Sequence, residues 1–195
     1  PLAGLRVLNL GWYWVCATMS HLLADMGAEV TKVDSLQRLE TLRTIPPFMD
    51  GIETPDRNLW LHNLLRNTQS VTVNLELEEG RQCLRDLVRT VDVVTENWTP
   101  GTMARLGLGY DALSATNPRL IYCSVTAFGL TGPYAARPGY DTVGQAMGAL
   151  LSVLTDLDNP KPMGVSLRDH LTGIMAAYGV LGAICARERT GRGQR

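Results

Sequence analysis

Cysteine and histidine are scarce in this chain, and neither occurs in a metal-binding arrangement. The 195 residues include four cysteines and three histidines, and no two cysteines form a CxxC pair. They stand at Cys16, Cys83, Cys123 and Cys185, and at His21, His62 and His170. This scatter argues against a zinc site or a disulfide framework as the basis of the fold. We therefore expect no metal site, and a chain that works in the reducing cytoplasm.

The chain also lacks an excess of charge of either sign. Lys plus Arg total 18 and Asp plus Glu total 19, which gives a net charge of -1. Without a global field, the sequence predicts no nucleic acid and no anionic membrane as a partner. An anionic ligand would have to be held by individual arginines.

A long run without full charges, residues 7–24, lacks the other features of a membrane span. Its 18 residues are borderline for crossing a bilayer, and polar side chains such as Asn9, Thr18 and His21 interrupt it. No basic segment leads into it, as a secretion signal would require. A strand, a turn and a helix account for the run better.

The rest of the pattern alternates short apolar runs with helical periodicity. Hydrophobic residues make up 45% and charged residues 19%, which is typical of a globular protein. Strands are predicted at 5–10, 28–34, 70–75, 91–97 and 119–129, and helices at 16–27 and 78–90. Such alternation predicts an α/β fold: a Rossmann-like parallel sheet with helices on both faces.

Two parts of the chain do not fit this alternation. Residues 35–69 carry several prolines and arginines, and a connection this long is typical of a functional or wrapping segment. Segments 142–155 and 170–186 are apolar helices rich in Gly and Ala, so we expect close packing and cover from more protein than this chain supplies.

Familiar nucleotide and hydrolase motifs are missing. The first predicted strand is followed by Gly11-Trp12-Tyr13-Trp14, not by GxGxxG, so NAD binding is disfavoured despite Asp34 at the end of the second strand. No Walker A sequence occurs. Ser166, Asp169 and His170 stand too close in sequence for an ordinary catalytic triad, whose members come from separate elements.

Asp169 precedes a charge-free helical run and has two interpretations. An Asp at a helix start is most often a cap that accepts hydrogen bonds from the free amides of the first turn. The same helix terminus also favours an ionised carboxylate, which is a usable nucleophile toward an activated acyl group. In both interpretations His170 is a packing or orienting residue, and Arg168 is solvated.

A second group of candidates surrounds the end of the strand predicted at 91–97. Ligands of open α/β sheets bind at such carboxyl ends. Trp98 could cover an adenine ring and Arg105 could pair with phosphate. The alternative is that Trp98 belongs to the core and Arg105 to the surface.

Seven stretches taken together resemble one family. They are PLAGLRVLNL, LLADMGAEVTKVD, NTQSVTVNLELEEG, DVVTENWTPGTMARLGLGYDAL, NPRLIYCSVTAFGLTGPY, RPGYD and ARERTGRGQ. Their order and spacing are similar to those of the class III CoA-transferase family, also called the CaiB/BaiF family. The resemblance covers essentially the whole chain.

The resemblance implies a function and a set of site residues. The family moves CoA from an acyl-CoA to a carboxylic acid through an aspartyl anhydride and an aspartyl-CoA thioester, and Asp169 matches its aspartate. Acyl-CoA is then a substrate, and no cofactor is tightly bound. The positions that match the family's CoA-contacting segments are Val15, Val73, Leu75, Asn97, Trp98, Thr99, Arg105, Arg137, Gly139 and Tyr140.

The sequence departs from the family pattern in three places. Val15-Cys16-Ala17 replaces the usual Ala-Gly-Pro turn, and Asn67-Thr68-Gln69-Ser70 replaces Asn-Lys-Arg-Ser, which removes two cations. The family also continues past RTGRGQ into a second, smaller domain. We therefore expect residues 1–195 to form one CoA-binding and catalytic domain, that second domain to be absent from this chain, and a homodimer or partner subunit to complete the site.

Two other functions stay open. Racemases of 2-methylacyl-CoA in the same superfamily look similar but carry Gly-His-Asp where this chain has Gly139-Tyr140-Asp141. The altered turn at Val15 is also consistent with a CoA-binding subunit that has no catalytic activity of its own.

Overall fold

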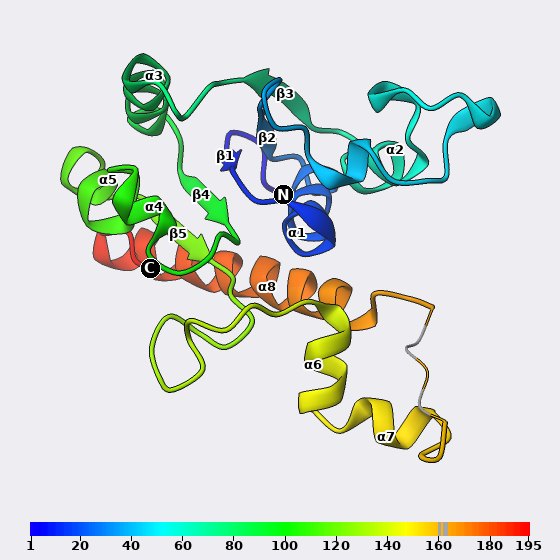
Figure 1. The fold of residues 1–195 in the computed structure, drawn as a ribbon. Coiled ribbons are helices and arrows are strands. Elements are labelled where there is room, and N and C mark those ends of the chain that lie inside the picture. Colours follow the sequence, from blue (N-terminus) through cyan, green and yellow to red (C-terminus); the bar gives the residue numbers. More distant parts are fainter. Residues whose placement is uncertain (160, 162–163) are drawn as a thin grey trace.

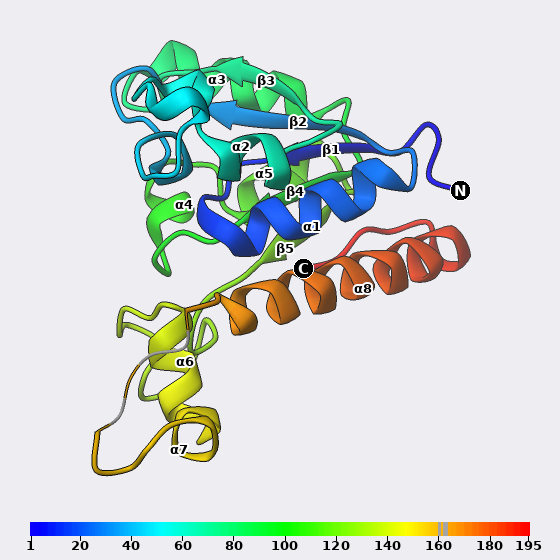
Figure 2. The same cartoon turned by 90° about the vertical axis from the view of Figure 1, so that its right-hand side faces the viewer.

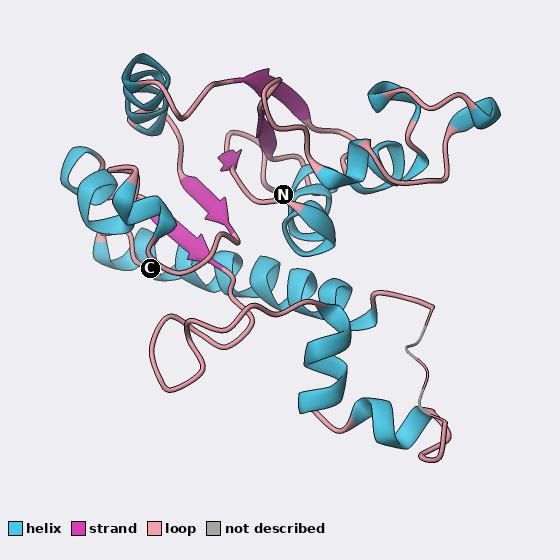
Figure 3. Ribbon diagram, in the orientation of Figure 1, coloured by secondary structure: helices cyan, strands magenta, loops and turns pink. Residues whose placement is uncertain are grey.

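The structure, a computed structural model, describes residues 1–159, 161 and 164–195. Five parallel strands form one sheet in the order β3-β2-β1-β4-β5 (Figure 1, Figure 3). The strands are β1 (Arg6–Asn9), β2 (Glu29–Asp34), β3 (Gln69–Thr72), β4 (Val93–Glu96) and β5 (Ile121–Ser124). The helices are α1 (Tyr13–Asp25), α2 (Leu59–Leu64), α3 (Glu78–Val88), α4 (Thr102–Arg105), α5 (Tyr110–Thr116), α6 (Asp141–Met147), α7 (Leu150–Leu154) and α8 (Leu167–Thr190).

Helices cover both faces of the sheet, as predicted. Neighbouring strand residues point to opposite sides, so Val7 and Val93 belong to the core cluster under α1 and α8. Leu8 and Val94 belong to the cluster under α3, α4 and α5. Figure 2 shows α1 and α8 running side by side along one face of the sheet. The predicted Rossmann-like α/β fold is therefore confirmed.

The direction of chain progression reverses at the centre of the sheet. From β1 the chain moves outward to β2 and β3, and then returns to β4 on the other side of β1. The strands β1 and β4 are adjacent, and the loops at their carboxyl ends lead away in opposite directions. This switch point is where open α/β sheets bind ligands.

The segment predicted as a functional or wrapping loop, residues 35–69, packs against α1. It contains α2 and three short 3₁₀ turns, at Thr41–Arg43, Met49–Gly51 and Pro55–Arg57. Leu42 and Leu64 are buried with Ala17 of α1, and the rings of Trp14 and Trp60 lie 5.5 Å apart. The segment therefore supports the N-terminal half of α1.

The predicted helix at 142–155 is wrong as a single element. The chain forms α6 and α7 with a break at Ala149, whose φ of 58° is left-handed and cannot continue a helix. Helix α8 is longer than the predicted 170–186 and begins at Leu167, so Asp169 lies inside its first turn. Figure 2 shows α6 and α7 standing clear of the sheet near the start of α8.

Helix α8 combines a packed side with an exposed apolar side. A Cβ on Gly173 would lie 2.7 Å from Cβ of Thr18, so the two helices touch at this glycine, as the small residues predicted. The large apolar side chains exposed on α8 are Leu171, Ile174, Met175 and Tyr178. By length and composition alone, α8 could also cross a membrane.

Candidate active site

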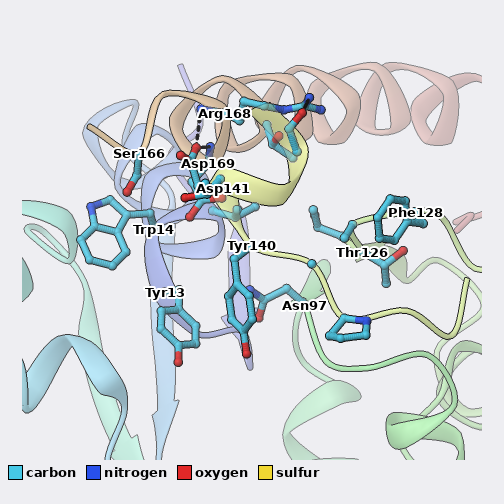
Figure 4. Close-up of a pocket in the computed structure, with 18 of the residues that line it drawn as sticks. Tyr13, Trp14, Asn97, Thr126, Phe128, Tyr140, Asp141, Ser166, Arg168 and Asp169 are labelled. Atoms are coloured by element: carbon cyan, nitrogen blue, oxygen red, sulfur yellow. Dashed lines mark hydrogen bonds between the residues drawn. The ribbon is translucent and has the colours of Figure 1, made fainter. Parts of the chain in front are cut away.

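A cavity of about 1000 Å³ lies at the carboxyl ends of the central strands. The loop between β1 and α1 forms one wall, and the segments after β4 and β5 form another. The first turns of α6 and α8 complete the lining, and Figure 4 shows their side chains together with Tyr13 and Trp14. Elements far apart in the sequence therefore meet at one site.

Most of the site residues expected from the sequence line this cavity. They are Val15, Asn97, Trp98, Thr99, Arg137, Gly139, Tyr140 and Asp169. The other three are not among its lining residues. Val73 is buried in the core, Leu75 packs against the same cluster, and Arg105 is exposed at the end of α4, where it donates to Oγ1 of Thr102 at 2.9 Å.

Asp169 faces the cavity from the first turn of α8 (Figure 4). Its carboxylate makes no hydrogen bond within the described residues. Burial, helped by the charge of Asp141, raises the pKa of Asp169 to about 6. The group is therefore mostly ionised near neutral pH, and no described residue donates a hydrogen bond to its oxygens.

The interpretation of Asp169 as the cap of its own helix is wrong. Ser166 occupies the N-cap position of α8 without a side-chain hydrogen bond. Oδ1 of Asp141 instead accepts the backbone N–H groups of Arg168 at 2.7 Å and Asp169 at 3.2 Å. A carboxylate from another helix does the capping, which leaves the Asp169 side chain free.

Neighbouring side chains hold Asp141 and α8 in place. The fully buried Gln145 donates to Oδ2 of Asp141. Arg168, expected to be solvated, instead donates to the carbonyl of Gly144 in α6. His170 is hydrogen-bonded to Oγ1 of Thr18 at 2.9 Å, which agrees with an orienting role. None of the described residues that line the cavity is a histidine.

The loop after β1 is fixed by Asn97. Its side-chain oxygen accepts the N–H of Trp12 at 2.8 Å, and its side-chain nitrogen donates to the carbonyl of Trp12 at 2.7 Å. A Cβ at Gly11 would lie 2.1 Å from the sulfur of Cys16, so the loop needs glycine there. Asn97 therefore shapes the cavity wall with both ends of its amide.

Trp98 packs in the core, as one of the two sequence interpretations expected, and it also reaches the cavity. It packs against the core cluster, and its indole N–H donates to the carbonyl of Leu10 at 2.9 Å. The residue also lines the cavity, with its ring 5.1 Å from that of Trp12.

The sequence interpretation missed several lining residues. Tyr13 and Trp14 follow β1 directly, and an aromatic run after a first strand was the available signal. Arg38 lies 5.0 Å over the ring of Trp12, and Arg137 lies 4.2 Å over that of Tyr134. Within the described residues neither arginine forms an ion pair, so both can receive an anionic ligand.

Potential metal ligands do not gather at this site or elsewhere in the part of the chain that the structure describes. No group of three or more His, Cys, Asp or Glu side chains there could hold a metal ion.

Comparisons with known proteins point to one family. The sequence model of CoA-transferase family III matches residues 2–195. A succinyl-CoA–D-citramalate CoA-transferase of Chloroflexus aurantiacus is 39% identical over 195 residues, covering 100% of this chain and 48% of that protein. The beta subunit of a succinyl-CoA–L-malate CoA-transferase of the same organism is 40% identical over 202 residues, covering 100% and 47%.

A solved structure agrees with these sequence comparisons. The crystal structure of a CaiB/BaiF family protein from Brucella suis matches with a TM-score of 0.91 at 39% identity, covering 100% of this chain and 51% of that one. The chain spans about half the length of these relatives.

Proposed function

The chain belongs to CoA-transferase family III, and from that premise we propose that it moves CoA from an acyl-CoA to a carboxylic acid through Asp169. One observation carries the proposal. The Asp169 carboxylate lies at the cavity without a hydrogen-bond partner among the described residues, because Asp141 caps the helix in its place. A carboxylate kept free in this way can act as a nucleophile.

The first half of the reaction loads CoA onto the protein. A carboxylate oxygen of Asp169 attacks the thioester carbonyl, a C–O bond forms, and the C–S bond breaks with release of the CoA thiolate. The product is a mixed anhydride between Asp169 and the acyl group. The thiolate then attacks the aspartyl carbonyl, so the donor acid leaves as a carboxylate and an aspartyl-CoA thioester remains.

The second half repeats these steps with the acceptor. The acceptor carboxylate attacks the aspartyl thioester, which releases the CoA thiolate and forms a new anhydride. Attack of the thiolate on the acceptor carbonyl gives the new acyl-CoA and regenerates the Asp169 carboxylate. No net proton or electron is exchanged, which fits a cavity whose described lining holds no histidine.

The surrounding side chains suit a large anionic thioester. Arg38 and Arg137 can pair with the phosphates of CoA, and the exposed edge of Trp98 can contact its adenine. Thr99, Gly139 and Tyr140 belong to the same cavity lining as these groups and Asp169. We keep Val73, Leu75 and Arg105 as proposed contacts of the nucleotide end, outside the cavity itself.

Further protein is proposed to cover the exposed face of α8. Leu171 is 50% exposed, Met175 63% and Tyr178 71%, and all three lie in the part of α8, residues 170–186, that carries no full charge. The relatives are about twice as long, and one of them is named as a beta subunit. A second copy of this chain or a partner subunit is the expected occupant, and light scattering of the purified protein tests it. A strictly monomeric, fully active protein would contradict it.

An exchange assay with a matched variant tests the function. Succinyl-CoA is the first donor to try, because two relatives carry it in their names. Asp169→Asn keeps the shape of the side chain but is a poor nucleophile, so transfer should fall by more than about a thousandfold while CoA still binds. Near-normal transfer by the variant would contradict the assignment.

Two further measurements, deuterium exchange and CoA binding, separate the two alternatives. A 2-methylacyl-CoA racemase would exchange the hydrogen at the α-carbon with deuterium in heavy water without any acceptor acid. A CoA-binding subunit without catalytic activity would bind CoA and give neither reaction.

A further inference from the structure

A fully buried ion pair lies behind the cavity wall formed by α1. Nζ of Lys32, in β2, lies 3.1 Å from Oε2 of Glu40, and each side chain is only 1% exposed. Asp34 is farther away, with Oδ1 at 3.7 Å from the same ammonium. Glu40 belongs to the segment 35–69, which thus places one of its charged groups inside the protein.

The second oxygen of Glu40 reaches the first residue of α1. Oε1 accepts the backbone N–H of Tyr13 at 2.9 Å. That amide has no partner within the helix, since the first turn of any helix leaves its N–H groups free. The residue before it, Trp12, gives no side-chain cap, so Glu40 supplies the acceptor from a distant part of the chain.

Tyr13 needs such support because its backbone is strained. Its φ is 60°, in the left-handed region that residues with a side chain seldom adopt. This conformation turns the chain from the extended Trp12 into α1. It also directs the ring of Tyr13 toward that of Tyr140, with centroids 6.3 Å apart at the cavity (Figure 4).

We propose that Glu40 is a positioning residue for the acyl-CoA site, acting through the backbone of Tyr13. The inference rests on the proposed function. Lys32 fixes the Glu40 carboxylate, the carboxylate holds Tyr13, and Tyr13 places itself, Trp14 and Val15 in the cavity wall. Asn97 holds Trp12 and Glu40 holds Tyr13, so the loop after β1 is fixed at two consecutive residues.

Two double variants separate the hydrogen bond from the charge. Lys32→Met with Glu40→Gln removes both charges but leaves an oxygen that can accept the Tyr13 N–H. Lys32→Met with Glu40→Met removes the charges and the acceptor at nearly the same side-chain volume. Apolar replacement of a buried ion pair is often tolerated, so both variants are expected to fold.

The variants should differ in substrate binding. For the Met/Met protein we expect KM for succinyl-CoA, and Kd for free CoA, to rise about tenfold while kcat changes less. The Met/Gln protein, which loses the support of Lys32 but keeps an acceptor for the Tyr13 N–H, should show a clearly smaller rise than the Met/Met protein. The proposal would be overturned if the two double variants had the same KM and Kd, whether these values equal those of the parent or are raised to the same extent.

Two further measurements keep the inference independent of folding and of the proposed function. In the parent protein the Tyr13 amide should be protected from hydrogen exchange, and exchange at the rate of a free amide would overturn the proposal. If the parent shows no transfer at all, the proposed function fails, whereas the CoA affinities of the two double variants still test Glu40. Asp169→Asn is the control that should lose transfer and keep CoA affinity.

Discussion

Asp141 and Asp169 are joined through the backbone: Oδ1 of Asp141 accepts the N–H of Asp169 at 3.2 Å. The charge of Asp141 thus lies beside the carboxyl group of Asp169 and, after burial, is the second cause of its raised pKa. One side chain both caps α8 and adjusts the acidity of the proposed nucleophile.

Removing the charge of Asp141 should make Asp169 more acidic. Asp141→Asn retains an oxygen that can accept the two amides, while the repulsion of a neighbouring anion is lost. Attack requires ionised Asp169, so kcat/KM should fall as pH is lowered through the pKa of Asp169. The midpoint of this fall should lie at about pH 6 in the parent and at lower pH in the variant. The shift will be partial because burial remains. If this midpoint in Asp141→Asn stays at the parent's pH or moves to higher pH, the proposed coupling between the two aspartates is refuted.

Asp169 should also reduce stability at neutral pH. Its pKa rises from 3.8 to about 6 on folding, so between these values the folded protein holds a proton that the unfolded chain has lost. The free energy of unfolding therefore falls as pH rises through this window and stays lowered above it. With allowance for solvent screening, Asp169→Asn should be more stable than the parent at pH 7 by about 1–2 kcal/mol.

That gain should disappear below about pH 3, where Asp169 is protonated in both the folded and the unfolded parent chain. Denaturant unfolding at the two pH values measures it. A variant that is less stable than the parent at neutral pH would show that Asp169 makes stabilising contacts after all.

Close packing of α8 on α1 gives a third prediction. A Cβ at Gly173 would lie 2.7 Å from the carbonyl oxygen of Val15, so Gly173→Ala should cost about 1–3 kcal/mol. Gly182→Ala is the control, since a Cβ there meets nothing within 4 Å and alanine favours a helix by up to about 1 kcal/mol. The Tm should fall for Gly173→Ala and rise for Gly182→Ala. If both variants shifted Tm in the same direction, the close packing at Gly173 would be contradicted.

Replacing Asn97 with alanine should destabilise the protein more than replacing the nearby Thr99. Asn97→Ala leaves the N–H and the carbonyl of Trp12 without partners, which costs about 1–3 kcal/mol. Thr99 is exposed, so Thr99→Ala should change stability by no more than about 0.5 kcal/mol. Equal stabilities in chemical denaturation would mean that the Asn97 contacts add nothing to the fold.

Much of the fold follows from local pattern. The strand predicted at 91–97, which contains the buried Val93 and Val94, and the periodic helix predicted at 78–90 were identified because elements packed in a parallel α/β fold need apolar residues at these positions. The break at Ala149 could not be predicted, since alanine favours helices and only tertiary contacts impose its left-handed φ.

Much of the site depends on contacts between distant residues. The order of strands brings Asn97 to Trp12, and the position of α6 brings Asp141 to Asp169, separated by 28 residues. Sequence therefore predicted Asp169 as a candidate nucleophile, but it also offered Asp169 the capping role that Asp141 performs. Arg38 was missed for the same reason, because its position over Trp12 depends on how residues 35–69 fold back on α1.

The central claim is that Asp169 exchanges an oxygen atom with the substrate acids. An acceptor acid whose carboxylate carries heavy-isotope oxygen should be incubated with succinyl-CoA and the protein, and the peptide containing Asp169 analysed by mass spectrometry. In the proposed route the acceptor oxygen that forms the anhydride stays on Asp169 when the thiolate attacks, so this peptide gains one heavy oxygen in the first turnover. Transfer of CoA to the labelled acid without any heavy oxygen on Asp169 would contradict the account.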